Sequence, residues 1–181
     1  MRSLLAIDCS TVNMGLAIFN DTSLGTWGKV EFQGKSISDK IIDTNIKLET
    51  FFSYFTIDDV VLESAFAGPN PKTGMNLSII QGVVAANALH HGAKHIGFVS
   101  PLSWQSFIGN PQLTISEKNA IMEEYPGKSG SWYKNYSKKM RKERTAKLMS
   151  ERYNIEVTDN DAADAIGIGT YAVNDPKAVK W

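Results

Sequence analysis

Two short apolar runs, each ending in an acidic residue, restrict the fold of this chain more than any other feature. Ser3–Asp8 reads Ser-Leu-Leu-Ala-Ile-Asp, and Val60–Glu63 reads Val-Val-Leu-Glu. Continuous apolar runs of this length are typical of strands that are covered on both faces. An ionised carboxylate beside such a core is costly unless a positive group pairs with it. We therefore expect an α/β fold in which both carboxylates meet a cation.

The remaining segments predict how this sheet is completed. Strands are predicted at Ser3–Cys9, Met14–Asn20, Thr26–Phe32, Ile57–Glu63 and Lys94–Ser100. Helices are predicted at Ser36–Phe55, Met75–His90, a short segment from Pro101, Ser116–Tyr125, Tyr136–Tyr153 and Asp159–Asn174. Gly68–Gly74 reads as a loop, and Gly109–Tyr136 is the least regular stretch. This order predicts one domain over residues 1–181, with a mixed five-stranded sheet and helices on both faces.

Composition is that of an ordinary globular chain. The 181 residues carry 19 basic and 19 acidic side chains, so the formal net charge is zero. No apolar run approaches the roughly 18 residues of a membrane span, and the N-terminus does not resemble a signal peptide. One cysteine, Cys9, cannot form an internal disulfide, and it is expected to be a small core residue. These features predict a cytoplasmic protein without a membrane partner.

Two further acids, Asp161 and Asp164, lie three residues apart on the last predicted helix and therefore project from one face. No Lys or Arg lies within five positions of either, so a divalent metal ion is the simplest partner. Oxygen ligands without a His or Cys cluster favour Mg²⁺ or Mn²⁺ over zinc. Such a site points to phosphate chemistry.

Each acid also has a plainer interpretation. Asp8 could start a turn, and Glu63 could be an exposed strand end. Thr158-Asp-Asn-Asp161 matches a capping box, which would account for Asp159 and Asp161 but less well for Asp164. The three histidines, His90, His91 and His95, are expected to be structural.

A basic segment precedes the last helix. Between residues 134 and 147 there is one acid, Glu143, among seven basic residues: Lys134, Lys138, Lys139, Arg141, Lys142, Arg144 and Lys147. Aromatic residues are interleaved from Trp132 onward. Cations neutralise phosphates and aromatic rings stack on exposed bases, so the segment is expected to bind DNA. The plainer interpretation is a solvated helix face.

Three motifs carry a resemblance to a known family. They are Ala6-Ile-Asp-Cys-Ser-Thr-Val-Asn-Met-Gly-Leu-Ala-Ile18, Val61-Leu-Glu-Ser-Ala-Phe66 and Asp161-Ala-Ala-Asp-Ala-Ile-Gly-Ile168. The chain resembles the RuvC family of Holliday-junction resolvases in the ribonuclease-H-like superfamily, most closely its phage-encoded branch. The last motif is similar to the family's Asp-Ala-Ala-Asp-Ala-Leu signature and is the most specific of the three.

The resemblance implies a metal-dependent endodeoxyribonuclease that resolves Holliday junctions, and other branched DNA, by paired nicks. Asp8, Glu63, Asp161 and Asp164 would hold two Mg²⁺ ions, for which Mn²⁺ can substitute, and Lys142 would be the active-site lysine. Phe66 would pack against bases at the junction centre. The DNA-binding residues implied are Phe66, Lys134, Lys138, Lys139, Arg141, Lys142 and Arg144.

The resemblance also implies a homodimer on four-way junction DNA, acting in the cytoplasm, which would be that of the host for a phage enzyme. The helix Met75–His90 resembles the family's dimer helix, with Ser78, Gln81, Gly82 and Ala85 as a packing face. Two features depart from the family. Trp104-Gln105 stands where a lysine is common, and the 109–137 segment is longer than in bacterial members.

Three other functions fit part of the pattern. A ribonuclease H cutting RNA–DNA hybrids would use the same acids. An actin-like or sugar-kinase-like ATPase is suggested by Asp8-Cys-Ser-Thr11 followed by Gly15, although such proteins need two such domains and lack the late acid pair. Because this chain is predicted to be a single domain, no nucleotide cofactor is expected. A catalytically inactive DNA-binding module is disfavoured by the retention of all four acids.

Overall fold

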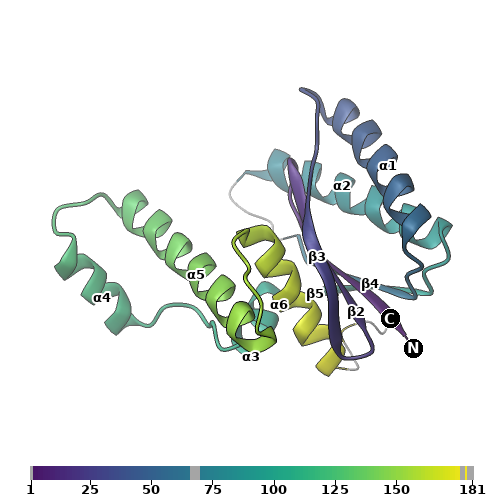
Figure 1. The fold of residues 1–181 in the computed structure, drawn as a ribbon. Helices are drawn as coiled ribbons and strands as arrows, with labels where there is room; N and C mark the ends of the chain where they lie inside the picture. Colours follow the sequence, from purple (N-terminus) through teal and green to yellow (C-terminus); the bar gives the residue numbers. More distant parts are fainter. Residues whose placement is uncertain (1, 66–69, 176–177, 179–181) are drawn as a thin grey trace.

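The computed structural model describes residues 2–65, 70–175 and 178, and it contains a mixed sheet between two layers of helices (Figure 1). The strands are β1 (Ser3–Cys9), β2 (Asn13–Asn20), β3 (Ser23–Glu31), β4 (Asp59–Glu63) and β5 (His95–Val99). The helices are α1 (Ile37–Tyr54), α2 (Pro71–His90), α3 (Pro101–Phe107), α4 (Ile115–Glu124), α5 (Gly130–Tyr153) and α6 (Asn160–Asn174).

The sheet has the strand order β3-β2-β1-β4-β5. β1, β2 and β3 pair antiparallel as a meander, whereas β4 pairs parallel with both β1 and β5. The two strands with apolar runs, β1 and β4, therefore lie side by side in the interior of the sheet. Their neighbouring carboxyl ends are where an α/β sheet usually binds its ligand.

Each face of the sheet is covered by its own set of helices. Leu4, Ala6 and Val61 belong to a core that includes residues of α3, α5 and α6. Leu5, Ile7, Val60 and Leu62 belong to a second core, with residues of α1 and α2. The predicted five-stranded α/β fold with helices on both faces is confirmed.

The element boundaries differ from the sequence prediction mainly at helix starts. α2 begins at Pro71 because Asn70 caps it and proline suits the first helical turn, so residues 71–74 of the predicted loop are helical. α5 begins at Gly130, where the Ser129 side chain accepts a hydrogen bond from the Trp132 N–H. The first half of α5 and the antiparallel α4 project from the sheet as an arm (residues 115–141; Figure 1).

Candidate active site

The four predicted carboxylates line one cavity of about 390 Å³. They come from β1 (Asp8), the end of β4 (Glu63) and the start of α6 (Asp161, Asp164). The other lining residues are Ser10, Gln105, Asn110, Lys138, Arg141, Lys142 and Thr145. Segments that are more than 150 residues apart in the chain therefore meet at a single site.

The period of a β-strand explains why Asp8 and Glu63 face the same way. Alternate residues of a strand point to the same face of the sheet. Asp8 follows Leu4 and Ala6 in this alternation, and Glu63 follows Val61, and these three residues all lie in the core beneath α6. Both carboxylates therefore project toward α6, and the suggestion that Glu63 is simply an exposed strand end does not apply.

The start of α6 places the other two acids. Asp159 is the N-cap, and its side chain accepts hydrogen bonds from the Asp161 and Ala162 N–H groups. The capping box considered at Thr158 is therefore wrong, because the cap lies one residue later. This leaves the side chains of Asp161 and Asp164 free of capping and directed at the cavity.

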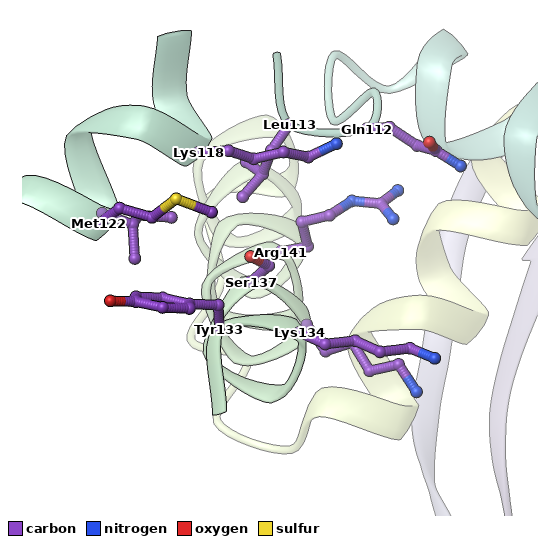
Figure 2. Close-up of a pocket in the computed structure, with 10 residues that line it drawn as sticks. Gln112, Leu113, Lys118, Met122, Tyr133, Lys134, Ser137 and Arg141 are labelled. Atoms are coloured by element: carbon purple, nitrogen blue, oxygen red, sulfur yellow. The ribbon is translucent and has the colours of Figure 1, made fainter. Parts of the chain in front are cut away.

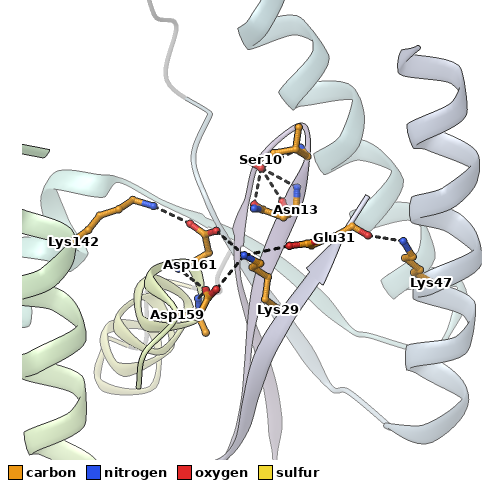
Figure 3. Close-up of polar contacts among 10 residues, drawn as sticks. Ser10, Asn13, Lys29, Glu31, Lys47, Lys142, Asp159 and Asp161 are labelled. Atoms are coloured by element: carbon orange, nitrogen blue, oxygen red, sulfur yellow. Dashed lines mark hydrogen bonds and ion pairs between the residues drawn. The ribbon is translucent and has the colours of Figure 1, made fainter. Parts of the chain in front are cut away.

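Lysines that are distant in the sequence neutralise part of this acidic cluster (Figure 3). Lys142 Nζ on α5 lies 2.8 Å from Asp161 Oδ1 and 3.9 Å from Asp164 Oδ2. Lys29 Nζ on β3 lies 3.1 Å from Asp159 Oδ2 and 4.0 Å from Asp161 Oδ2. No Lys or Arg lies within five positions of the acid pair in the sequence, but folding brings Lys142 and Lys29 to it from other elements.

Burial raises the pKa values of three of the four carboxylates. Burial, with the nearby charges of Asp164 and Glu63, raises the pKa of Asp8 well above its ordinary value. Burial also raises the pKa of Asp164 to about 7, against the opposing effect of Lys142. Burial raises the pKa of Glu63, although a hydrogen bond from Trp104 acts in the other direction. Three acids with raised pKa values in one cavity form a site that favours an added cation.

The sequence pattern did not identify Trp104 as part of the site. Its indole is fully buried, and Nε1 donates a hydrogen bond of 2.7 Å to Glu63 Oε2. On the other side, Gln81 Nε2 donates to the Glu63 backbone carbonyl at 2.8 Å. The sequence analysis placed Gln81 on an outward packing face of α2. In the structure Gln81 is buried, so it is not part of such a face. The departure at Trp104-Gln105 was visible in the sequence, but its contact with Glu63 was not.

The donor set of the cavity fits a hard divalent cation, because it is made of carboxylate oxygens with amide and hydroxyl groups around them. Within the described ranges, three ligand atoms lie within 4.8 Å of one another at Glu49, His90 and His91, on the opposite helical layer. No three of the four cavity acids meet that spacing. Lys142 Nζ lies within 4.0 Å of carboxylate oxygens of both Asp161 and Asp164.

The predicted DNA-binding residues separate into two groups. Lys134, Lys138 and Lys139 are exposed on α5. In contrast, Arg141 donates hydrogen bonds to the side chain of Gln105 and to the Asn110 carbonyl, and Arg144 pairs with Glu117 at 2.8 Å. The two arginines hold the arm to its surroundings. Phe66 lies outside the described residues.

The smaller predictions have mixed outcomes. Cys9 is buried and unpaired in the core, as expected. His95 pairs with the buried Asp59 at 2.7 Å, which agrees with a structural role. His91 is hydrogen-bonded to Glu49 at 2.9 Å, and the structural role of His90 and His91 stays a prediction.

The fold and the cavity define the chain as a ribonuclease-H-like α/β protein with a carboxylate-lined cleft. No protein-family model matches the chain. It is 28% identical over 123 residues to the crossover junction endodeoxyribonuclease RuvC of Aliarcobacter butzleri, a match that covers 66% of this chain and 79% of that protein. The chain is a homologue of RuvC.

Solved structures share the fold. RuvC of Thermus thermophilus in complex with a Holliday junction substrate superposes with a TM-score of 0.68 at 13% identity, covering 96% of this chain and 94% of that one. The yeast mitochondrial Holliday junction resolvase Ydc2 gives a TM-score of 0.52 at 14% identity, covering 94% and 77%. Both matches cover nearly the whole of this chain.

Proposed function

We propose that this protein is an endodeoxyribonuclease that resolves four-way DNA junctions, and that residues 1–181 act as one catalytic domain. The observation that carries the proposal is the convergence of Asp8, Glu63, Asp161 and Asp164 on one cavity of a RuvC-like fold. The homologous relatives named above are junction endonucleases, which gives the substrate class. We also propose that the protein belongs to the phage-encoded branch of these resolvases.

The four acids would hold two divalent metal ions, with Mg²⁺ as the proposed metal and Mn²⁺ as its substitute. When bound, such a pair supplies an activated water and stabilises the leaving oxygen of an in-line phosphodiester cleavage. The chain's own contribution is positioning. Asp8 is fixed by the interior strand β1, and Glu63 is held by Trp104 and Gln81.

Lys142 is proposed to stabilise negative charge at the scissile phosphate. Burial opposes its charged form, but the hydrogen bond to Asp161 and the charge of Asp164 raise the pKa of Lys142 overall. The lysine is therefore protonated at neutral pH and can place an ammonium group at the cavity. A fixed cation of this kind stabilises charge that develops in the transition state.

DNA would reach the cavity along α5, whose Lys134, Lys138 and Lys139 are exposed. Phosphate contacts by such side chains position a nucleic acid without reading its sequence. Among the described residues, no helix is both long and apolar enough to cross a membrane. Because the substrate is DNA, we place the enzyme in the cytoplasm, or in the host cytoplasm if a phage encodes it.

A junction has two-fold symmetry, so paired nicks are most simply made by a two-fold dimer. One exposed stripe of α2 supports this arrangement. It repeats every three or four residues and consists of Met75, Ile79, Gly82, Ala86 and Leu89. Small and apolar side chains at this spacing allow two helices to pack closely.

The direct test is cleavage of a synthetic four-way junction by the wild-type protein and by Asp8→Asn. We expect nicks with Mg²⁺ or Mn²⁺, none with EDTA, and a loss of at least a hundredfold for Asp8→Asn. Flap, linear duplex and RNA–DNA hybrid substrates run in parallel measure selectivity. Cleavage of the hybrid alone would replace this proposal with a ribonuclease H activity, and absence of any cleavage would refute it.

A further inference from the structure

A second cavity lies inside the arm, between α4 and α5 (Figure 2). Its volume of about 450 Å³ is within the range of roughly 300–1,000 Å³ typical of small-ligand sites. Leu113, Ile121, Met122 and Tyr133 form an apolar part. The Tyr133 hydroxyl donates to the Tyr125 carbonyl at 2.6 Å, so the ring is held in place at the cavity wall.

The opposite part of the cavity is cationic. Lys118, Lys134 and Lys138 line it, and none of the described lining residues is acidic. Within residues 2–65, 70–175 and 178, none of these three lysines has a carboxylate within 4.0 Å. In contrast, the neighbours Lys139, Arg144 and Lys147 are paired with Glu143, Glu117 and Glu151, respectively. The cavity therefore combines the aromatic ring of Tyr133 with three lysines that have no carboxylate partner in the part of the chain that the structure describes.

This cavity adjoins the candidate active site. Lys138 and Arg141 line both cavities. In Figure 2 the charged ends of Lys118, Lys134 and Arg141 point to the side where α6 and the sheet lie, whereas Met122 and Tyr133 are on the other side. Arg141 Nε is buried without a hydrogen-bond partner among the described residues. A strand held by the cations would run directly between the two cavities.

We propose that this pocket takes one unpaired base of the DNA strand whose backbone enters the active-site cavity. The proposal rests on the proposed nuclease function. Aromatic side chains stack on any base, and lysines neutralise the flanking phosphates, so the pocket matches a single-stranded nucleotide on both counts. A base still paired in a duplex is stacked between its neighbours and cannot enter, which makes the pocket selective for DNA that is open near the cut, as at a branch point.

The test combines filling the pocket with removing the base. Ser137 lines the cavity and is half-buried, so Ser137→Phe would occupy the space of the base. The control is Asn135→Phe, which adds the same ring at an exposed α5 position outside the cavity. Both changes are made in the Asp8→Asn background so that the DNA stays uncut. Binding is measured to junctions that carry a single abasic site, moved one nucleotide at a time through the strand near the cut.

We expect one position at which the abasic site weakens binding by Asp8→Asn about tenfold, which is the loss of one stacked base. Ser137→Phe should weaken binding to the intact junction to a similar extent and should be insensitive to the abasic site at that position. Asn135→Phe should retain the full sensitivity. Thermal melting checks that each variant is folded, and Ser137→Leu, with less added volume, replaces Ser137→Phe if the latter is not.

Two results overturn the pocket while leaving the nuclease intact. One is junction nicking by the wild-type protein with no sensitive position in the abasic scan. The other is a sensitive position at which the abasic site weakens binding to the same extent in Ser137→Phe and in Asn135→Phe. A wild-type protein that cuts no DNA would overturn the proposed function and the pocket together.

Discussion

Gly15 determines how closely α6 can approach the sheet. It pairs with Asp8 across β1 and β2, and a Cβ at this position would overlap the backbone carbonyl of Asp161. The residue therefore has no room for a side chain, because the first turn of α6 lies directly against the strand. Because the side chain of glycine is only a hydrogen atom, α6 can lie close enough for Asp161 and Asp164 to reach the cavity that holds Asp8.

Replacing Gly15 with Ala should displace the start of α6. We expect the free energy of unfolding to fall by about 1–3 kcal/mol, as for other overpacked contacts. Junction nicking should fall by about a hundredfold, because a misplacement of about 1 Å has that effect at an active site. Gly28→Ala on β3 is the control, since a Cβ there meets nothing within 4 Å. Equal nicking rates for the two variants would contradict this role of Gly15.

The raised pKa of Asp164 predicts that the site destabilises the metal-free protein. The ordinary pKa is 3.8 and the folded value is about 7, so between these values the native state binds more protons than the unfolded state. The free energy of unfolding should therefore fall as the pH rises from about 4 to about 7. Above pH 7 the full cost of the buried charge is present.

Asp164→Asn removes this charge while keeping the shape of the side chain. In EDTA at pH 8 the free energy of unfolding of the variant should exceed that of the wild type by a few kcal/mol, which is the order of magnitude that the pKa shift implies. At pH 4 the two free energies should be similar. Its nicking activity should be lost. Denaturant unfolding at both pH values provides the measurement. If the Asn variant were less stable than the wild type at pH 8, other groups in the cavity would already offset the charge of the Asp164 carboxylate.

At the scale of elements, α5 performs two separate tasks. Its exposed lysines face solvent along the arm, whereas Arg141, Lys142 and Arg144 contact other elements. The structure thus separates residues suited to bind DNA from those that hold the arm or line the candidate active site. A basic run in a sequence does not reveal this division, because it depends on which face of the helix meets α4 and α6.

Lys134→Ala combined with Lys138→Ala should weaken DNA binding and make it less dependent on salt. Each lost phosphate contact lowers the slope of log K against log salt by about 0.9, so the double variant should lose about 2. Lys147→Ala is the control, because Lys147 pairs with Glu151 one turn along the helix. An unchanged slope in the double variant, measured by fluorescence anisotropy between 50 and 200 mM salt, would exclude these lysines from the interface.

At the scale of the whole molecule, the sheet separates the side that carries the candidate active site from the side proposed for assembly. α3, α5 and α6 cover the face with the acids, and α1 and α2 cover the other. α2 also contacts the site directly, since Gln81 supports Glu63 from its inner side while Ile79 is exposed. A dimer formed through α2 would therefore fix the relative positions of two active sites.

Ile79→Glu should prevent this dimer. We expect the wild type to sediment as a dimer at micromolar concentration and the variant as a monomer, since two charges would face each other across a two-fold axis. The variant should still nick junctions but should lose the coupling between the two cuts. Ile115→Glu, an equally drastic change at an exposed α4 position, is the control. A wild-type monomer, with or without junction DNA, would contradict the assembly.

The sequence alone determined the order of the strands and helices, the mixed α/β class and the identity of the four acids. These features are local: apolar runs, helical periodicity and short motifs are present in the order of residues. The boundaries of α2 and α5 were less clear because Pro, Gly and Ser at a helix start also occur in loops.

Only the tertiary structure decided what surrounds each carboxylate. The approach of Lys142 and Lys29 to Asp161, the hydrogen bond from Trp104 to Glu63 and the close passage of α6 over Gly15 all join residues that are distant along the chain. The physical reason is that charge pairing and steric exclusion depend on distance in space, whereas strand and helix patterns depend on separation along the chain.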